Sequence, residues 1–241
     1  MRCFQGRLFT VDGMIEDEAP LKKEIYEQIR YYATTSVARR IEHIMQAIKL
    51  ACASEPPEIQ MDRIHVRNGT YFADGHFTPE KEYCMNRLPI AYVSDAPAPT
   101  RWLQFLNELL YEEDIPALQE YIGYCLLPVT KAQKMLLMVG KGGEGKSRIG
   151  LILRELFGSS MYTGSLQKVE TNRFARADLE YKLLLVDDDM KTEALPQTNN
   201  IKTLVTLEDK IDIERKGQQS VQGTLYVRFA CFGNGLSLIH I

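Results

Sequence analysis

The chain has 241 residues, of which 45% are hydrophobic and 25% are charged, and its formal net charge at pH 7 is −3. This composition is typical of a soluble globular chain that is long enough for one large or two small cores. No apolar run reaches the length of a membrane span, and residues 1–13 show neither a signal peptide nor a transit pattern. We therefore expect no membrane association and a cytoplasmic location.

The cysteines, histidines and charges exclude further classes of protein. The five cysteines are scattered without a C-x-x-C pair, and the four histidines show no ligand spacing, so neither a disulfide framework nor a zinc site is indicated. The slight excess of acid argues against a protein that coats nucleic acid nonspecifically. It does not exclude a protein whose basic groups gather on one internal surface.

Residues 1–55 are predicted to form an N-terminal helical region. Pro20 opens a pattern in which Leu21, Ile25 and Ile29 share one helix face. A second helix is expected to end near Ala53. Its apolar face comprises Val37, Ile41, Ile44, Ile48 and Leu50.

Residues 56–98 are predicted to be a small strand-and-turn region that ends in a linker. The dipeptides Asn68-Gly69 and Asp74-Gly75 are typical of hairpin turns. Residues 99–131 are predicted to be a helical segment, with Thr100 as its N-cap. Its aromatic residues have helical spacing, so we expect a core role rather than a base-stacking surface for Trp102, Tyr121 and Tyr124.

The segment GKGGEGKS matches every position of the G-x-x-x-x-G-K-[ST] phosphate loop. In such a loop, backbone N–H groups surround the β-phosphate of a nucleoside triphosphate, Lys146 reaches the β- and γ-phosphates, and the Ser147 hydroxyl ligates Mg²⁺. A buried strand is predicted at residues 134–139 and an amphipathic helix follows as far as Gly158, which is the setting that this loop requires. The predicted ATP-binding residues are Gly140, Lys141, Gly142, Gly143, Glu144, Gly145, Lys146 and Ser147.

A second group of candidate residues follows the apolar run at residues 183–186. Acids at the carboxyl end of a buried parallel strand stand at the sheet edge where ligands bind in open α/β folds. Asp187 is the predicted Mg²⁺ ligand, through water, and Asp188 is predicted to polarise the attacking water. The alternative is that these acids, with Asp189, form a solvated turn.

A third apolar run, residues 226–232, ends in Gly233-Asn234-Gly235. We predict another buried strand, whose Asn234 amide could hydrogen-bond the γ-phosphate or the attacking water. Because Asn-Gly is also a common turn dipeptide, the alternative is a plain turn. Together the three elements predict an α/β fold with a P-loop ATPase core over residues 132–235.

Between the second and third elements, residues 209–216 read Asp-Lys-Ile-Asp-Ile-Glu-Arg-Lys. This hairpin segment, in order with the phosphate loop, the Asp-Asp strand and the strand ending in Asn, resembles a superfamily three helicase of the phage and plasmid primase family. Upstream, residues 64–70 resemble the small β-region of that family, and residues 99–106 and 118–126 resemble its helical segment before the motor. The resemblance covers residues 64–235.

The resemblance implies an AAA+-like, ATP-dependent DNA helicase of phage or plasmid replication in a bacterial host. It implies ATP and Mg²⁺ as cofactors and a homo-hexameric ring around single-stranded DNA. In such rings the hairpin projects into the central channel, so the expected DNA-binding residues are Arg215 and Lys216, beside Gly217. No aromatic or histidine lies beside Lys216, which leaves phosphate contact as the mechanism. The alternative is a solvated charged hairpin, because acids surround the basic pair at Glu208, Asp209, Asp212 and Glu214.

Residues 236–241 resemble the translation of a transposase adapter from sequencing libraries, and we expect them to be a non-native tail. The alternative is a native apolar strand. If the tail is foreign, the chain is a C-terminally truncated motor without the arginine that family members insert into the neighbouring subunit's ATP site, and we expect almost no ATPase activity from it. The resemblance also implies a primase, as a partner or as a fused domain, although residues 1–53 show no primase acid motifs.

Two other function classes remain open. Another P-loop ATPase, such as a nucleotide kinase or a packaging ATPase, would keep Lys146 and Asp187 but would lack a hairpin that grips DNA. A non-catalytic DNA-loading protein would bind ATP or DNA without turnover. DNA-stimulated hydrolysis separates these classes.

Overall fold

The main body of the molecule is a three-layer α/β unit built on a parallel sheet. The structure is a computed structural model that describes residues 1–190, 198–206, 210–217 and 219–234. The sheet has four strands in the order β7-β12-β9-β8, and its neighbouring strands pair in parallel. The predicted α/β fold class is therefore confirmed. The strands are β7 (Leu136–Gly140), β8 (Met161–Thr163), β9 (Leu184–Met190) and β12 (Arg228–Asn234).

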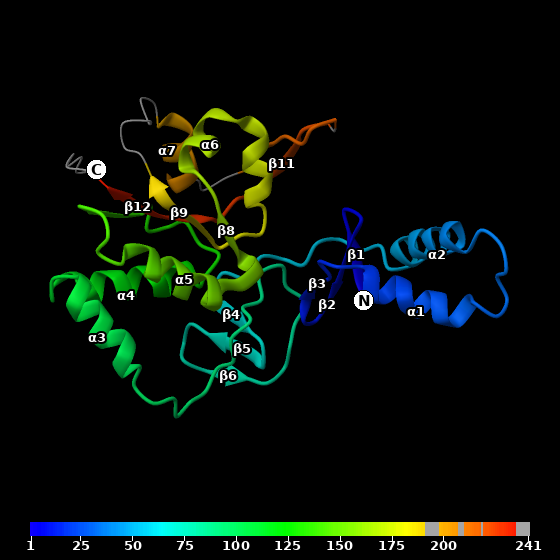
Figure 1. Ribbon diagram of the computed structural model, residues 1–241, viewed down its shortest axis with the longest axis horizontal. Coiled ribbons are helices and arrows are strands. Elements are labelled where there is room, and N and C mark those ends of the chain that lie inside the picture. Colours follow the sequence, from blue (N-terminus) through cyan, green and yellow to red (C-terminus); the bar gives the residue numbers. More distant parts are fainter. Residues whose placement is uncertain (191–197, 207–209, 218, 235–241) are drawn as a thin grey trace.

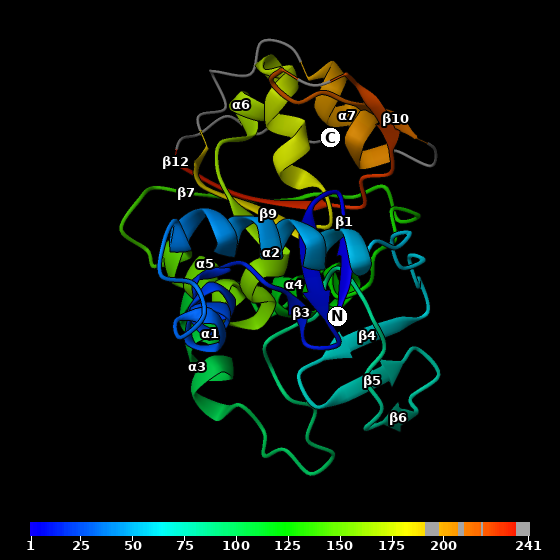
Figure 2. The ribbon, with the colours of Figure 1, turned by 90° about the vertical axis from the view of Figure 1, so that its right-hand side faces the viewer.

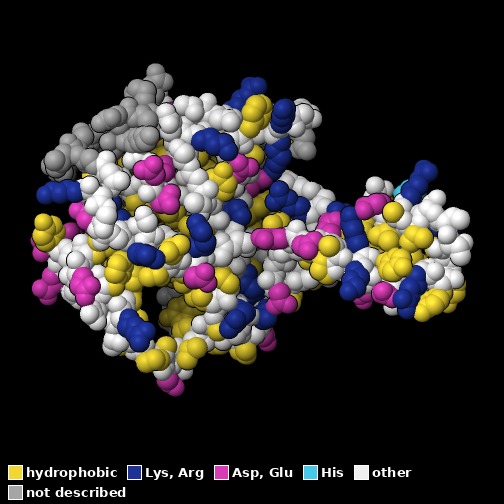
Figure 3. Space-filling model, in the orientation of Figure 1, with side chains coloured by type: hydrophobic (Ala, Val, Ile, Leu, Met, Phe, Trp, Pro, Cys, Tyr) yellow, Lys and Arg dark blue, Asp and Glu magenta, His cyan; other side chains and the backbone are white. Residues whose placement is uncertain are grey.

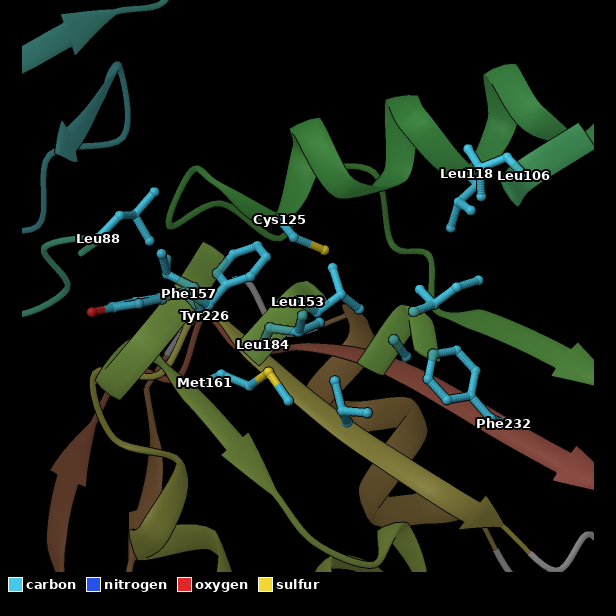
Figure 4. Packing of buried hydrophobic residues seen from close by; sticks show 14 of the residues in the cluster. Leu88, Leu106, Leu118, Cys125, Leu153, Phe157, Met161, Leu184, Tyr226 and Phe232 are labelled. Carbon is cyan, nitrogen blue, oxygen red and sulfur yellow. The ribbon is translucent and has the colours of Figure 1, made fainter. Parts of the chain in front are cut away.

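Helices cover both faces of this sheet (Figure 1). One face packs against α3 (Thr100–Leu109), α4 (Asp114–Cys125) and α5 (Lys146–Phe157), and the other packs against α6 (Leu166–Thr171) and α7 (Asn199–Thr206). Figure 4 shows side chains of the first core, which includes Leu106, Leu118, Leu153, Leu184 and Phe232. The core on the second face includes Leu166, Leu185, Ile201, Leu204 and Phe229.

The β9 strand shows why an unbroken apolar run forms a central strand. Successive side chains of a strand point to opposite faces, so Leu184 and Val186 pack in the core with α5, whereas Leu185 packs in the core with α6. A strand covered on both faces needs apolar residues at every position. The predicted strand at residues 183–186 extends further than expected, to Met190.

The strand before the phosphate loop departs from its prediction. The sequence predicted a buried strand at residues 134–139, but the residues of β7 are only partly buried, and Val139 is 47% exposed. The cause is the strand order, which places β7 at one end of the sheet, where β12 is its only partner among the described strands.

A β-hairpin lies between β9 and β12 along the chain. It comprises β10 (Ile211–Ile213) and β11 (Val221–Gly223), which pair antiparallel. The hairpin predicted from the sequence is thus confirmed. Short 3-10 helices occur at η1 (Gly158–Ser160) and η2 (Arg173–Leu179), and η2 leads from α6 toward β9.

The N-terminal part forms a separate projection from the α/β body (Figures 1 and 2). Its helices are α1 (Ala19–Ile29) and α2 (Val37–Ala51). Most of the predicted apolar faces are confirmed, because Leu21, Ile25, Ile29, Ile41, Ile44 and Ile48 pack together in a small core, which Met45 also joins. The predicted Val37 is only partly buried and is not part of that core. The assignment of Leu50 to that face is wrong, since this residue is 79% exposed near the helix end.

A small antiparallel sheet before α1 was not predicted. It comprises β1 (Arg2–Phe4), β2 (Arg7–Thr10) and β3 (Gly13–Met14). These strands are too short for a period-2 pattern to be recognised. The turn between β1 and β2 uses positive φ angles of 48° at Gln5 and 75° at Gly6.

The strand-and-turn region contains the two predicted hairpins. Its strands are β4 (Arg63–Val66), β5 (Gly69–Phe72) and β6 (Phe77–Thr78), and each pairs antiparallel with the next. The predicted cap of the following helix is off by one residue, because Pro99 is the N-cap of α3 and Thr100 is its first residue. In the described part of the chain, no helix has both the length and the hydropathy of a membrane span.

Candidate functional site

The phosphate loop connects the end of β7 to the start of α5. Gly142, Gly143 and Gly145 have φ angles of 97°, 75° and 99°, which lie in the left-handed region that residues with a side chain rarely adopt. The turn therefore requires glycine at these positions. Helix α5 begins directly after it at Lys146, so the first backbone N–H groups of the helix, which lack partners within it, lie at the loop.

The side chain of Lys146 is buried at the loop and is paired with Glu144. The Lys146 ammonium nitrogen lies 3.0 Å from Glu144 Oε2, while Glu144 Oε1 accepts the backbone N–H of Lys141 at 3.1 Å. The hydrogen bond from Lys141 and the contact with Lys146 lower the pKa of Glu144. The Glu144 carboxylate therefore joins one side of the loop to the other.

The loop has the shape and the donors of an anion site. A Cβ atom placed on Gly140 would collide with Glu144 Oε2 and would lie 2.6 Å from the Lys146 ammonium nitrogen. Only glycine lets a negatively charged group come so close to the backbone here. The residues present thus fit a nucleotide phosphate, and the exposed Ser147 hydroxyl lies at the position that would ligate Mg²⁺.

The acids predicted at the end of a strand lie within β9 itself. Asp187 is buried, and its carboxylate accepts the backbone N–H of Leu166 at 2.7 Å and of Asp189 at 3.3 Å. Burial raises the pKa of Asp187, and the two backbone hydrogen bonds oppose that shift. Asp188 and Asp189 are exposed. Asp187, the predicted metal ligand, is therefore already engaged in holding the start of α6.

The pairing of β9 with β12 is irregular at these acids. Cys231 pairs with Asp187 and Gly233 pairs with Met190, so β9 contains one more residue than β12 over this stretch. Bulges of this kind change the direction of nearby side chains and are common beside active sites. Here the bulge coincides with the two exposed carboxylates.

Asn234 lies beside the phosphate loop. It pairs with Gly140 in parallel register at the carboxyl ends of β12 and β7. Its side-chain amide atoms lie 3.6 to 3.8 Å from the position that a Cβ on Gly142 would take. Because β12 lies between β7 and β9, the loop, the asparagine and the acids meet at one edge of the sheet.

Sequence reasoning missed the contribution of α3 to the loop. A ring carbon of Phe105 lies 3.6 Å from the position of a Cβ on Gly145, and Trp102 stacks on Phe105 with ring centroids 5.7 Å apart. The helical spacing of these aromatic residues predicted that they pack in the core. It did not predict that Phe105 lies against Gly145 of the phosphate loop. The predicted core role of Trp102 and Tyr121 is confirmed, because both pack against the core with α5.

The two predicted DNA-binding residues have different surroundings. Arg215 forms an ion pair with Glu180 and also donates to Gln5 Oε1 at 3.4 Å. The neighbouring Glu214 pairs with Arg173 at 3.2 Å. Through these two ion pairs, the connection between β10 and β11 is attached to η2 and to Glu180, the residue that follows η2. The Arg215 guanidinium is therefore not free in this structure.

Lys216 is exposed at the tip of the hairpin. Gly217 follows it with a φ angle of 74°, in a conformation that favours glycine. Of the acids predicted around it, Asp212 accepts a hydrogen bond from a β11 side-chain amide at 2.6 Å. Glu208 and Asp209 lie outside the described residues. On the face drawn in Figure 3, basic and acidic side chains are interspersed.

A metal ion at this edge would depend on the nucleotide. Within residues 1–190, 198–206, 210–217 and 219–234, no group of three or more His, Cys, Asp or Glu side chains is arranged to hold a metal. Mg²⁺ in nucleotide sites is bound by phosphate oxygens and water with one or two protein ligands. The loop and the exposed acids are sufficient for that mode of binding.

Two family models match the chain. The family described as "D5 N terminal like" (D5_N) matches residues 9–110, and a "Family of unknown function (DUF5906)" matches residues 138–239. The first match spans α1, α2, the sheet of β4, β5 and β6, and α3, and the second spans the phosphate loop, the acids and Asn234. No curated protein matches the chain.

Solved structures of the NrS-1 C-terminal region share the fold. "The apo structure of NrS-1 C terminal region (305-718)" has a TM-score of 0.52 at 15% identity, over 95% of this chain and 54% of that chain. "The A form apo structure of NrS-1 C terminal region-CTR" has a TM-score of 0.50 at 16% identity, over 92% of this chain and 49% of that chain. This chain thus spans about half the length of the solved relatives that it matches.

A solved JCV helicase with a bound small molecule is less similar. The alignment covers 56% of this chain and 39% of that chain at 20% identity, and its TM-score is only 0.40. The D5_N match and the NrS-1 fold agree with the order of motifs along the sequence. Each family model covers less than half of the chain, so the chain shares a D5_N-like segment, a DUF5906-like segment and the fold of the NrS-1 C-terminal region with these proteins.

Proposed function

We propose that this chain is the motor of an ATP-dependent DNA helicase that acts in phage or plasmid replication. The family and the fold support a helicase-like role in replication. The observation that carries the finer proposal is the meeting of the phosphate loop, the exposed acids and Asn234 at one edge of the sheet. This edge brings together hydrogen-bond donors for phosphate, carboxylates and an amide, which are the groups that phosphoryl transfer to water requires.

Each side chain at this edge has a distinct proposed role. Lys146 and the loop N–H groups hold the β- and γ-phosphates of ATP, and Ser147 offers its hydroxyl to Mg²⁺. Asp188 is the carboxylate proposed for the metal and the attacking water, because it is exposed whereas Asp187 already accepts two backbone N–H groups. The Asn234 amide orients the γ-phosphate or the water. Bound Mg-ATP supplies the phosphoryl group.

Single-stranded DNA is the proposed track of the motor. Lys216 can contact a backbone phosphate without reading a base, because it is exposed on a glycine-containing tip. Arg215 is proposed as an anchor of the hairpin rather than a second DNA contact, since its guanidinium is paired with Glu180. The mixed charges of the face in Figure 3 also favour contact through a small tip over contact through a broad basic surface.

The proposed assembly is a homo-hexameric ring around the DNA, with each ATP site completed by the neighbouring subunit. The proposed partner is a primase, either separate or fused to the same polypeptide, and the proposed location is the cytoplasm of a bacterial host. The D5_N match and the resemblance of the motif order to phage and plasmid primase-helicases support these proposals.

The test is a titration of the chain with a fluorescent ATP analogue and Mg²⁺, followed by phosphate release with and without single-stranded DNA. We expect saturable nucleotide binding by the chain, almost no hydrolysis by the chain alone, and in the assembled protein hydrolysis that rises with protein concentration and with DNA because the site is shared between subunits. Hydrolysis insensitive to DNA would favour a nucleotide kinase or packaging ATPase, and binding without hydrolysis in the assembled protein would favour a DNA-loading protein. Absence of saturable nucleotide binding would contradict the proposal.

A further inference from the structure

The Glu144 carboxylate contacts two hydrogen-bond donors of the loop that, in the proposed function, bind a phosphate of ATP. One carboxylate oxygen accepts the Lys141 backbone N–H at 3.1 Å, and the other lies 3.0 Å from the Lys146 ammonium nitrogen. The same carboxylate lies where a Cβ on Gly140 would collide with it. A negatively charged group of this chain therefore already contacts two hydrogen-bond donors of the phosphate loop.

We propose that Glu144 is an internal competitor of the nucleotide, whose carboxylate occupies the phosphate position and must swing out when a nucleoside triphosphate binds. This inference rests on the proposed nucleotide-binding function. On this proposal, Glu144 is the residue that sets the affinity of the phosphate loop for nucleotide. The apparent dissociation constant then equals the intrinsic constant divided by the fraction of molecules with the carboxylate out.

The surroundings of Glu144 allow this movement. Its side chain is 41% exposed, whereas that of Lys146 is 8% exposed, so the carboxylate can leave into solvent while the lysine stays. Gly143 and Gly145 flank it, and both have positive φ angles. A triphosphate carries more charge and more acceptor oxygens than a carboxylate, so it can displace this group from the same donors.

A different role for Glu144 makes the opposite prediction. If the carboxylate only braces the loop in the shape that binds phosphate, its removal loosens the loop and weakens nucleotide binding. If it competes with phosphate, its removal frees both Lys146 and the Lys141 N–H and strengthens binding. Glu144→Gln separates the two contacts, because an amide oxygen can still accept the Lys141 N–H but has no charge to pair with Lys146.

The experiment measures the dissociation constant of a fluorescent Mg-ATP analogue for the wild-type chain, Glu144→Ala and Glu144→Gln. The control is Glu155→Gln, which removes the same charge from an exposed position on α5 away from the loop. We expect Glu144→Ala to bind on the order of tenfold more tightly, which is the gain if the carboxylate is in place about nine-tenths of the time. Glu144→Gln should gain less, and Glu155→Gln should match the wild type.

A second measurement does not use nucleotide. Thermal unfolding of Glu144→Gln, Lys146→Met and the double variant tests the contact itself, and the double variant should lose less in Tm than the two single variants together. Additive losses would overturn the inference, as would unchanged or weaker nucleotide binding by both Glu144 variants. If the losses in Tm are not additive but neither the wild type nor the variants bind nucleotide, the proposed function is wrong, and so is the proposed competition between Glu144 and nucleotide.

Discussion

Two turns of this molecule carry a lysine next to a glycine, and their surroundings differ sharply. Gly145-Lys146 lies between a sheet and a helix, and its lysine is buried and paired with Glu144. Lys216-Gly217 lies at the end of a two-stranded hairpin, and its lysine is exposed. The same two residue types thus lie in a buried, ion-paired setting in one turn and in an exposed setting in the other, and we expect the first to be a fixed site and the second a movable tip.

The difference follows from what stands behind each turn. The phosphate loop rests on α5, on a strand of the main sheet and on the Phe105 ring. The hairpin has only three residues in each strand, and an isolated hairpin is marginally stable in water. Ile213 anchors it in the core with α6, and the ion pairs of Arg215 with Glu180 and of Glu214 with Arg173 hold the connection between its strands.

The largest expected effect separates the two lysines directly. Lys146→Ala should weaken nucleotide binding by about a hundredfold, because it removes the charged partner of the phosphates from a buried position. Lys216→Ala should leave nucleotide binding within about twofold, because an exposed surface substitution changes little. Titration with a fluorescent ATP analogue measures both. Equal losses in the two variants would show that the fixed site and the movable tip are not distinct.

The second prediction separates Asp187 from Asp188 at the same sheet edge. Asp187→Asn should lower the free energy of unfolding by about 1 to 3 kcal/mol, because one of its two backbone N–H partners would face an NH₂ group instead of an oxygen. Asp188→Asn should leave stability nearly unchanged and should reduce the gain in ATP affinity on adding Mg²⁺ by about tenfold. Urea unfolding and titration with and without Mg²⁺ test these outcomes. Loss of the Mg²⁺ effect in Asp187→Asn alone would restore Asp187 as the metal ligand.

Asp187 and Asp188 also illustrate which features of the fold and the site could be predicted from the sequence. The phosphate loop, the apolar strand before the acids and the strand before Asn234 are local patterns, so they could be recognised in single segments. The α/β class followed from their order. The placement of β12 between β7 and β9, which brings Asn234 to Gly140, depends on pairing between segments far apart in the chain and could not be predicted from either segment.

Other features depended on contacts that no local pattern contains. The carboxylate of Asp187 accepts the backbone N–H at the start of α6, and the contact between Glu144 and Lys146 depends on the folded shape of the loop. The ion pair that holds Arg215 involves Glu180, which is distant in sequence. In each case the charged residue could be picked out in the sequence, but its partner depends on the folded structure.

The third prediction applies one substitution to both turns. Gly145→Ala and Gly217→Ala each force a side chain onto a positive φ angle, of 99° and 74°, at a local cost of about 1 to 2 kcal/mol. In the phosphate loop we expect this cost to appear in the free energy of global unfolding, because the turn joins β7 to α5 and Gly145 lies against the Phe105 ring. In the hairpin we expect the tip to relax locally, so that global stability hardly changes. Chemical denaturation measures both variants, and a global loss in Gly217→Ala would show that the tip is as firmly held as the loop.

The smallest expected effect concerns DNA and tests whether the movable tip is the contact. Lys216→Ala should weaken binding of single-stranded DNA about equally for all sequences and should lower the slope of log affinity against log salt by about 0.7, the value for one phosphate contact on a single strand. Lys202→Ala, at an exposed position on α7, is the matched control and should leave the slope unchanged. Arg215→Ala should act differently, because Arg215 is held by Glu180. It should free the connection that carries Lys216 and weaken DNA binding, without lowering the salt slope by the value of a full phosphate contact. Fluorescence anisotropy at several salt concentrations measures all three variants. If Arg215→Ala lowers the slope as much as Lys216→Ala, the ion pair with Glu180 opens when DNA binds and both residues grip the strand.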